Sequence, residues 1–313
     1  NMHGHAELFT LNTMLRLFKT SIPIVITTHG TLASSLFLPL MELSRESSLV
    51  DHAIIRLKNL IASNMSIKLI EKRASMIISL SEVERRILLM YGINPARICI
   101  INNFVPDEYF KFKPKDEVLD KYGLRPYEYI ISVSRIHHSK GLDQIIKALA
   151  NLHKHGIKIT YVIIGPDEGA LNYYLALASK MGIKDHVIYL GVVEKEQLLT
   201  LLHYSMAFIL PSRHLEGQSV AVIEAMSQGT PVVISSIANF LGRLVKHREN
   251  GFIFRYGDVL SLTNILRTLF EDESLRNKLG KNAFRYAYEQ HRLSKAVDKY
   301  VKIFRTLREI YYR

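Results

Sequence analysis

The second half of the chain alternates short apolar runs with longer segments in which apolar residues recur at helical spacing. Five apolar runs have the length and the β-branched content of strands, and they cover residues 129–134, 159–165, 186–190, 207–210 and 231–235. The spacing between them predicts helices over residues 141–156, 170–181, 195–204 and 220–227. Such alternation predicts βαβ units, a parallel sheet and an α/β fold. Runs such as YVIIG at 161–165 are apolar throughout, which is typical of strands covered on both faces.

The first half of the chain is less regular. Apolar runs predict strands at residues 22–27, 76–79 and 97–101, and helical spacing appears at residues 8–19, 51–73 and 82–91. This pattern resembles part of a second α/β domain but offers too few strands for a complete doubly wound sheet. A polar stretch at 111–125 contains Pro114 and predicts the domain boundary, so we expect domains at residues 1–120 and 121–313.

The composition is that of a globular protein, with 48% hydrophobic and 22% charged residues. Cys99 is the single cysteine, which excludes an internal disulfide framework and a cysteine-based zinc site. A reducing cytoplasmic location is therefore expected. The most apolar stretch, residues 22–43, is interrupted by polar residues, glycine and proline, which makes it a poor membrane span, and no pattern typical of a signal peptide precedes it.

The formal net charge of +12 indicates an anionic partner. Residues 276–313 hold eleven Lys and Arg against three acidic residues, so most of the excess lies on the terminal segment. Such a charge run is more often a solvated face than a binding surface. A nucleic-acid partner is not expected, because the chain has no tryptophan and no basic strand motif with interleaved aromatic residues.

The last predicted helix, residues 294–312, carries apolar side chains at helical spacing with cations between them. We expect its apolar stripe to pack on the protein itself, and the stripe consists of Val297, Val301, Phe304, Leu307 and Ile310. The cations Lys295, Lys299, Lys302, Arg305 and Arg308 would then face outward. These charges could meet an acidic membrane surface, so peripheral attachment to the inner face of the membrane is an open alternative to a purely solubilising role.

The segment at residues 211–233 carries the most informative chemistry. It follows an apolar strand and therefore lies at the carboxyl end of the parallel sheet, where open α/β folds bind ligands. Gly217, Gln218 and Ser219 would open a helix whose free N–H groups suit a phosphate. Glu216 precedes this helix, and Glu224 lies two turns into it on roughly the same side. Carboxylates accept hydrogen bonds from paired sugar hydroxyls, although Glu216 as a helix cap and Glu224 as a surface charge are the alternatives.

Two cations follow the first strand of this half. Arg135 and Lys140 lie in the loop before the next helix, at the same predicted edge of the sheet. They could neutralise the charge that builds on a leaving diphosphate, whereas an isolated Arg and Lys in a loop would more often be solvated. Gly165 opens a glycine-containing turn, residues 165–169, after the following strand. No Asp-x-Asp motif that could hold a metal against a diphosphate is present, so no metal site is predicted.

Together these residues resemble the signature of the family 4 retaining glycosyltransferases of the GT-B fold. The resemblance rests on the Glu216-x7-Glu224 spacing with Gly229 and Pro231 after it, and on the loop from Ser134 to Gly141. It implies two Rossmann-like domains, of which the N-terminal one is incomplete here. It further implies that Glu216 contacts the donor sugar, that Glu224 contacts the ribose, and that Arg135 and Lys140 hold the diphosphate.

The resemblance also assigns a position in the first half, where Thr27, Thr28, His29 and Gly30 match a place at which a family histidine points toward the donor sugar. His29 is therefore a predicted catalytic residue beside Glu216, Arg135 and Lys140, although a lone histidine at a strand end is more often structural. The loop at residues 238–243 departs from the family, because the usual Gly-Gly pair and glutamate are missing. This departure leaves the identity of the donor open. The family's N-terminal glycine-rich loop is missing too.

The resulting hypothesis is a hexosyltransferase that retains the anomeric configuration. Its donor is a UDP- or GDP-linked sugar, which is a substrate, so no cofactor is expected. The acceptor is a glycan, a lipid-linked molecule or a small molecule. The alternative is a catalytically silent subunit that binds a nucleotide-sugar or a partner protein, and the incomplete first half and the altered loop favour that alternative.

Overall fold

The computed structural model describes residues 22–28 and 72–311. The chain divides into two compact units, one formed by residues 1–102 with 297–313 and the other by residues 103–296. We predicted a single boundary at 120/121, with the basic tail in the second domain. The structure differs because residues 103–120, including η2 (Asp107–Lys111) and the start of α5 (Glu117–Tyr122), contribute to the core of the second unit, whereas the tail from Val297 onward belongs to the first.

The first unit contains, within its described residues, a parallel three-stranded sheet. Its strands are β1 (Ile24–Thr27), β2 (Ala74–Ser79) and β3 (Ile98–Ile100), at the positions that the apolar runs predicted, and they lie in the order β1-β2-β3. Helix α4 (Glu82–Met90) follows β2 and begins at Ser81, whose hydroxyl accepts a hydrogen bond from the backbone of Glu84 at 3.1 Å. The predicted helices at residues 8–19 and 51–73 lie outside the described residues, apart from the last two.

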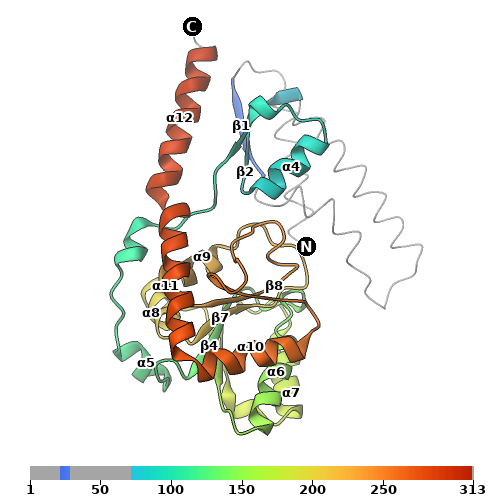
Figure 1. Ribbon diagram of the computed structural model, residues 1–313, viewed down its shortest axis with the longest axis vertical. Helices are drawn as coiled ribbons and strands as arrows, with labels where there is room; N and C mark the ends of the chain where they lie inside the picture. Colours follow the sequence, from blue (N-terminus) through green and yellow to red (C-terminus); the bar gives the residue numbers. More distant parts are fainter. Residues whose placement is uncertain (1–21, 29–71, 312–313) are drawn as a thin grey trace, which may run out of the picture. The chain divides into compact units, whose positions relative to one another are not determined.

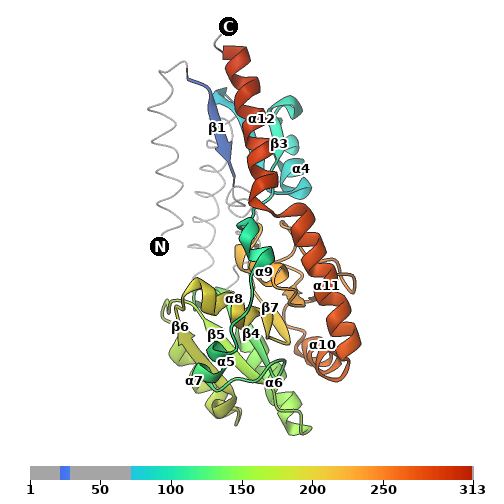
Figure 2. The ribbon, with the colours of Figure 1, turned by 90° about the vertical axis from the view of Figure 1, so that its left-hand side faces the viewer.

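The second unit is built on a parallel six-stranded sheet. Its strands are β4 (Tyr129–Val133), β5 (Thr160–Ile164), β6 (Val187–Gly191), β7 (Ala207–Leu210), β8 (Val232–Ser235) and β9 (Gly251–Phe254). They lie in the order β6-β5-β4-β7-β8-β9, and Figure 2 shows β6, β5, β4 and β7 side by side in this sequence. The chain therefore builds the sheet outward from β4 in one direction, and then returns to the other side of β4 with β7. This is the doubly wound order.

Two apolar cores cover the two faces of this sheet. Along β5, Tyr161 and Ile163 belong to one core, and Val162 and Ile164 belong to the other. This alternation follows from the two-residue period of a strand. The first core also contains α6 (Asp143–Lys154), α7 (Leu171–Lys180) and α10 (Val259–Glu271), and the second contains α5, α8 (Lys195–His203) and α9 (Val220–Ser227) (Figure 1). The uninterrupted apolar strands predicted from the sequence are thus buried on both sides.

Strand β9 and helices α5 and α10 of this unit were not predicted. Strand β9 is a four-residue run, GFIF, and α10 begins after Asp258, whose carboxylate accepts a hydrogen bond from the backbone of Ser261 at 2.9 Å. Helix α11 (Glu273–Gln290) starts in the same way at Asp272. The aspartates at both caps were readable in the sequence as helix starts.

The terminal helix α12 (Leu293–Tyr311) buries a different stripe from the one expected. Val297, Val301, Phe304 and Ile310 are exposed, with exposed fractions of 54% for Phe304 and 65% for Ile310, so the prediction that they pack on the protein is wrong. Leu307 is buried as predicted, together with Ala296 and Ile303. Both stripes have helical spacing and lie next to each other around the helix, so periodicity alone could not choose between them. Within the described residues, none of the helices combines the length and the apolarity that a membrane crossing requires.

Candidate functional site

The candidate site lies at the carboxyl edge of the six-stranded sheet, beside the place where the strand order reverses. Strands β4 and β7 are neighbours although they are far apart in the sequence. The loop after β4 and the loop after β7 therefore leave the sheet side by side. In open α/β sheets this switch point is where ligands bind. All the residues that the sequence assigned to diphosphate and sugar contacts in this unit follow one of these two strands, apart from Gly165, which follows β5, and Glu224, which lies farther along α9.

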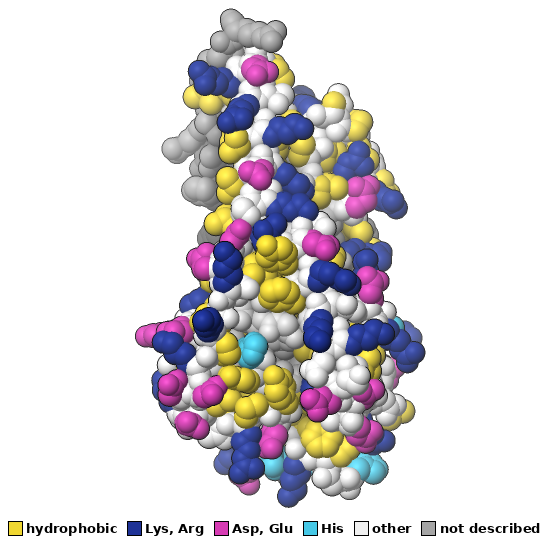
Figure 3. Space-filling model, turned by 60° about the vertical axis from the view of Figure 1, so that its left-hand side comes forward, with side chains coloured by type: hydrophobic (Ala, Val, Ile, Leu, Met, Phe, Trp, Pro, Cys, Tyr) yellow, Lys and Arg dark blue, Asp and Glu magenta, His cyan; other side chains and the backbone are white. Residues whose placement is uncertain are grey.

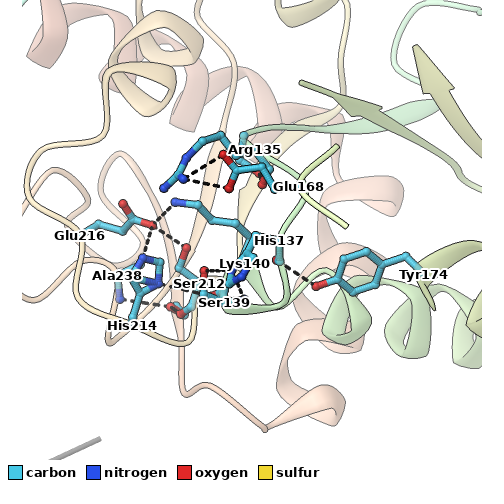
Figure 4. Close-up of polar contacts among 12 residues, drawn as sticks. Arg135, His137, Ser139, Lys140, Glu168, Tyr174, Ser212, His214, Glu216 and Ala238 are labelled. Atoms are coloured by element: carbon cyan, nitrogen blue, oxygen red, sulfur yellow. Dashed lines mark hydrogen bonds and ion pairs between the residues drawn. The ribbon is translucent and has the colours of Figure 1, made fainter. Parts of the chain in front are cut away.

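Hydrogen bonds tie the two loops together. The carbonyl oxygen of Ser139, in the loop after β4, accepts a hydrogen bond from the backbone N–H of Arg213 at 3.0 Å, and Nδ1 of His214 lies 3.3 Å from the same oxygen (Figure 4). The hydroxyl of Ser235, at the end of β8, donates to the carbonyl oxygen of Ser212 at 2.6 Å. Three neighbouring strand ends are thus connected, which holds the side chains between them in place.

Lys140 and Glu216 form an ion pair across the switch point. The ammonium nitrogen of Lys140 lies 2.7 Å from Oε1 of Glu216, and the two side chains are 11% and 17% exposed (Figure 4). The hydroxyl of Ser212 donates to the same oxygen at 2.6 Å, and Nε2 of His214 lies 3.7 Å from it. Burial by itself would raise the pKa of the Glu216 carboxyl, but Lys140, Ser212 and His214 hold that pKa below its ordinary value. Glu216 is thus a buried carboxylate that stays charged.

Arg135 forms an ion pair with a carboxylate that was not predicted. Its guanidinium Nη1 donates to both carboxylate oxygens of Glu168, at 2.8 and 3.0 Å (Figure 4). These side chains are 46% and 37% exposed, so the pair contributes little to stability and can open at small cost. Glu168 follows β5, the neighbour of β4, and it stands in the turn that the sequence singled out after Gly165.

Glu224 lies on α9, which begins after Ser219 as predicted. Its carboxylate is 9% exposed and pairs through Oε1 with the ammonium of Lys195 at 2.5 Å. Lys195 is the first residue of α8, which follows β6. The alternative that Glu224 is a surface charge is therefore excluded by its burial.

Gln218 and Gly217, just before α9, contact the backbone of two neighbouring segments. The amide oxygen of Gln218 accepts from the backbone N–H of Asn103 at 2.8 Å, and its amide nitrogen donates to the carbonyl oxygen of Gly242 at 3.3 Å. A Cβ atom on Gly242 would lie 2.2 Å from the carbonyl oxygen of Gly217, so this close approach requires glycine. The loop that departs from the family pattern is thus packed against the start of α9. A donor contact by Gln218 remains a prediction, and its side chain has these two partners.

Gly165 lets two neighbouring strand ends approach each other. It has a φ of +134°, and a Cβ atom there would lie 1.9 Å from the carbonyl oxygen of Ser134. The loop that carries Arg135 can therefore lie directly beside the turn that carries Glu168. His29 lies outside the described residues, so its catalytic role stays a prediction.

Four residues of the site were not predicted, although each stands within or next to a segment that carries a predicted turn, helix or site residue: Glu168, Lys195, Ser212 and His214. Ser212 and His214 belong to the segment that contains Glu216. Glu168 and Lys195 could have been proposed from the rule that carboxyl ends of parallel strands meet at one edge. Their partners, however, depend on the order of the strands.

Comparison with known families identifies this arrangement. The family model described as glycosyl transferases group 1 matches residues 115–286, more than half of the chain, and the model described as Glycosyltransferase Family 4 matches residues 2–109. The chain belongs to the group 1 glycosyl transferases. The resemblance stated from the sequence is therefore confirmed.

Curated relatives and solved structures agree with this assignment. An uncharacterized glycosyltransferase of Methanocaldococcus jannaschii is 27% identical over 230 residues, which are 72% of this chain and 56% of that protein. The UDP-Gal:alpha-D-GlcNAc-diphosphoundecaprenol alpha-1,3-galactosyltransferase of Escherichia coli is 28% identical over 214 residues, 66% of this chain and 54% of that protein. The chain spans about half the length of the curated relatives that it matches.

The fold is shared with Anabaena HepE, solved in complex with UDP-glucose. The TM-score is 0.77 at 20% identity, and the match covers 96% of this chain and 77% of that chain. This glycosyl transferase therefore has the GT-B fold class, with a parallel α/β sheet in each unit.

The buried ion pair leads to a prediction about stability. Replacing Lys140 by Met should lower the free energy of unfolding by about 3–5 kcal/mol at neutral pH, because it leaves the Glu216 carboxylate buried without a counter-charge. The pKa of Glu216 is held below its ordinary value in the folded protein. The contribution of the ion pair to stability is therefore complete at a pH above the ordinary carboxyl pKa, and it is lost as the pH falls through the lowered pKa. Chemical unfolding of both proteins across the acid range should show the difference narrowing toward low pH.

The matched control is Lys246→Met, which removes a pair with Glu249 in which both side chains are largely exposed. It should change stability by less than about 0.5 kcal/mol. A difference between Lys140→Met and the parent that stays constant with pH would show that the loss does not come from the charge of Glu216.

Proposed function

We propose that this glycosyl transferase transfers a hexose from a UDP- or GDP-linked donor to an acceptor with retention of the anomeric configuration. The observation that carries the proposal is the buried Lys140–Glu216 pair at the switch point, with the buried carboxylate of Glu224 at the same sheet edge. The two pairs offer cations for a diphosphate and carboxylates for the hydroxyls of the two sugars that flank it.

The roles follow from the chemistry of each group. Glu216 accepts hydrogen bonds from hydroxyls of the transferred sugar, and Glu224 accepts from the ribose. The Lys140 ammonium has three N–H donors, so it can donate to a phosphate while it stays paired with Glu216. Arg135 leaves Glu168 and turns to the diphosphate, which a weak exposed pair permits. The free N–H groups at the start of α9 add further positive potential.

In the transfer, the bond between the anomeric carbon and the diphosphate oxygen breaks, and a bond from the acceptor oxygen to that carbon forms. The products are the nucleoside diphosphate, the glycoside and one proton. Arg135 and Lys140 stabilise the negative charge that develops on the leaving diphosphate. His29 remains the proposed catalytic residue of the first unit.

Nucleotide binding tests the proposal. The protein should bind UDP or GDP and the corresponding nucleotide-sugars in a calorimetric panel, and Glu224→Ala should weaken that binding by about 1.5–3 kcal/mol, the scale for a hydrogen bond to a charged group. Ala is a good helix former, so α9 should stay folded. Unchanged affinity in Glu224→Ala would remove the ribose assignment.

A catalytically silent binding subunit is the second candidate, and the loop at residues 238–243 favours it because the glutamate of the family pattern is missing. Both candidates bind the nucleotide. Incubation with a labelled nucleotide-sugar separates them, since the enzyme releases nucleoside diphosphate by transfer or by slow hydrolysis. Binding without any release would support the silent subunit.

We further propose that transfer needs no metal ion, because Arg135 and Lys140 supply the positive charge that a divalent cation would otherwise bring to the diphosphate. Activity should persist in excess EDTA at the level measured without chelator. Loss of activity that manganese or magnesium restores would contradict this mechanism.

The basic terminal helix supports a proposal about location, namely weak attachment to the acidic inner face of the membrane from the cytoplasmic side. The exposed apolar side chains of α12 lie beside Lys302, Arg305 and Arg308, and Figure 3 shows Lys and Arg side chains along this helix with hydrophobic ones between them. Each cation near an acidic surface contributes about 1 kcal/mol. A lipid-linked acceptor would suit this placement, alongside a glycan or a small molecule.

Vesicle co-sedimentation tests the attachment. The protein should sediment with phosphatidylserine-containing vesicles at low salt, and much less at high salt or with neutral vesicles. Arg305→Glu with Arg308→Glu should reduce sedimentation strongly, whereas Lys278→Glu on α11 should change it less. Equal recovery in the supernatant in all conditions would leave the tail as a solubilising face.

A further inference from the structure

Lys195 stands between a carboxylate and an aromatic ring at the edge of the candidate site. It is the first residue of α8, and its ammonium nitrogen lies 2.5 Å from Oε1 of Glu224. The same nitrogen lies 5.8 Å from the centroid of the Tyr109 ring. Tyr109 is held in turn by α9, because its carbonyl oxygen accepts from the side-chain amide of Gln228 at 2.9 Å. Contacts to two different elements fix the position of the ammonium.

The two members of this ion pair differ in burial. The Glu224 side chain is 9% exposed, whereas the Lys195 side chain is 49% exposed. Within the described part of the chain, no side-chain donor other than Lys195 contacts the Glu224 carboxylate. A carboxylate at this depth requires a counter-charge, and without one it would turn toward solvent. Lys195 therefore decides whether Glu224 is available as an acceptor.

We propose that Lys195 is a positioning residue that keeps the Glu224 carboxylate oriented toward the ribose, and thereby sets a preference for ribonucleoside over 2′-deoxyribonucleoside diphosphates. The inference rests on the proposed function, in which Glu224 accepts from the ribose hydroxyls. An ionised carboxylate has about four lone-pair positions. Lys195 uses one of them, so two adjacent ribose hydroxyls can use others at the same time.

The 2′-hydroxyl is the group whose loss reports on this contact. A 2′-deoxyribose offers the carboxylate one donor in place of two. The parent protein should therefore bind the ribonucleotide about tenfold or more tightly than its deoxy counterpart. A carboxylate that is turned away gains little from either hydroxyl, so the preference should fall when Lys195 loses its charge.

The experiment measures the dissociation constants of UDP and GDP and of their 2′-deoxy forms by calorimetry, in the parent and in a set of variants. Lys195→Met keeps the length of the side chain and removes the charge, and the ribo-to-deoxy preference should drop toward one, mainly through weaker binding of the ribonucleotide. Lys195→Arg restores the charge and should restore most of the preference. A positive result needs both changes.

The matched control is Lys115→Met. Lys115 pairs with Glu196, the residue next to Lys195 on α8, at 2.6 Å, and both side chains are exposed. Its removal should leave all four affinities unchanged. Lys195 is half exposed, so Lys195→Met is expected to fold, and Lys195→Gln offers a second neutral variant. The double variant with Glu224→Gln should show no further loss of preference beyond Glu224→Gln alone.

Two outcomes would overturn the inference without affecting the proposed function. If Lys195→Met weakens ribo and deoxy forms by the same factor, Lys195 contacts the nucleotide directly and does not act through Glu224. If it changes neither affinity, the ion pair has no part in binding. A parent protein that binds none of the four nucleotides would overturn the proposed function and this inference with it.

Discussion

The ion pair between Lys140 and Glu216 is the interaction on which the candidate site depends. It joins the loops after β4 and β7, two strands that are neighbours although helices and two other strands separate them in the sequence. Removing both charges from water is costly, and the pair is maintained by the hydroxyl of Ser212 and by His214 beside it. A buried pair of this kind contributes less to stability than its short distance suggests. The main effect of the pair is to fix one carboxylate and one cation at a defined place on the sheet edge.

The two cations of the site differ in how firmly they are held. Lys140 is buried and shares its carboxylate partner with Ser212, so it can receive a phosphate without moving far. Arg135 is exposed and pairs with an exposed Glu168, so it can exchange that partner for a phosphate at little cost. In the proposed transfer, one firmly held cation and one exposed cation would suit a leaving group that must be bound before the reaction and released after it.

The terminal helix shows how one sequence pattern can support two arrangements. Its apolar residues form two adjacent stripes, of which Ile303 and Leu307 are buried and Val301 and Phe304 are exposed. Lys299 also donates to the carbonyl oxygen of Ile100 at 3.1 Å, so not every cation that the sequence placed outward is free to meet a partner. The exposed apolar stripe with its neighbouring cations is the part of the helix that an acidic lipid surface could contact.

The sequence by itself determined most of the strands and helices of the second unit and the residues that stand at the strand ends. Apolar runs and helical spacing are local properties, and so is the rule that places Arg135, Lys140 and Glu216 after buried strands. The order of the strands was decided only in the tertiary structure, since it depends on packing between segments far apart in the chain. That order pairs Lys140 with Glu216, Arg135 with Glu168, and Lys195 with Glu224. The buried stripe of α12 was decided there too, because a helix with two apolar stripes buries the one for which a complementary surface exists.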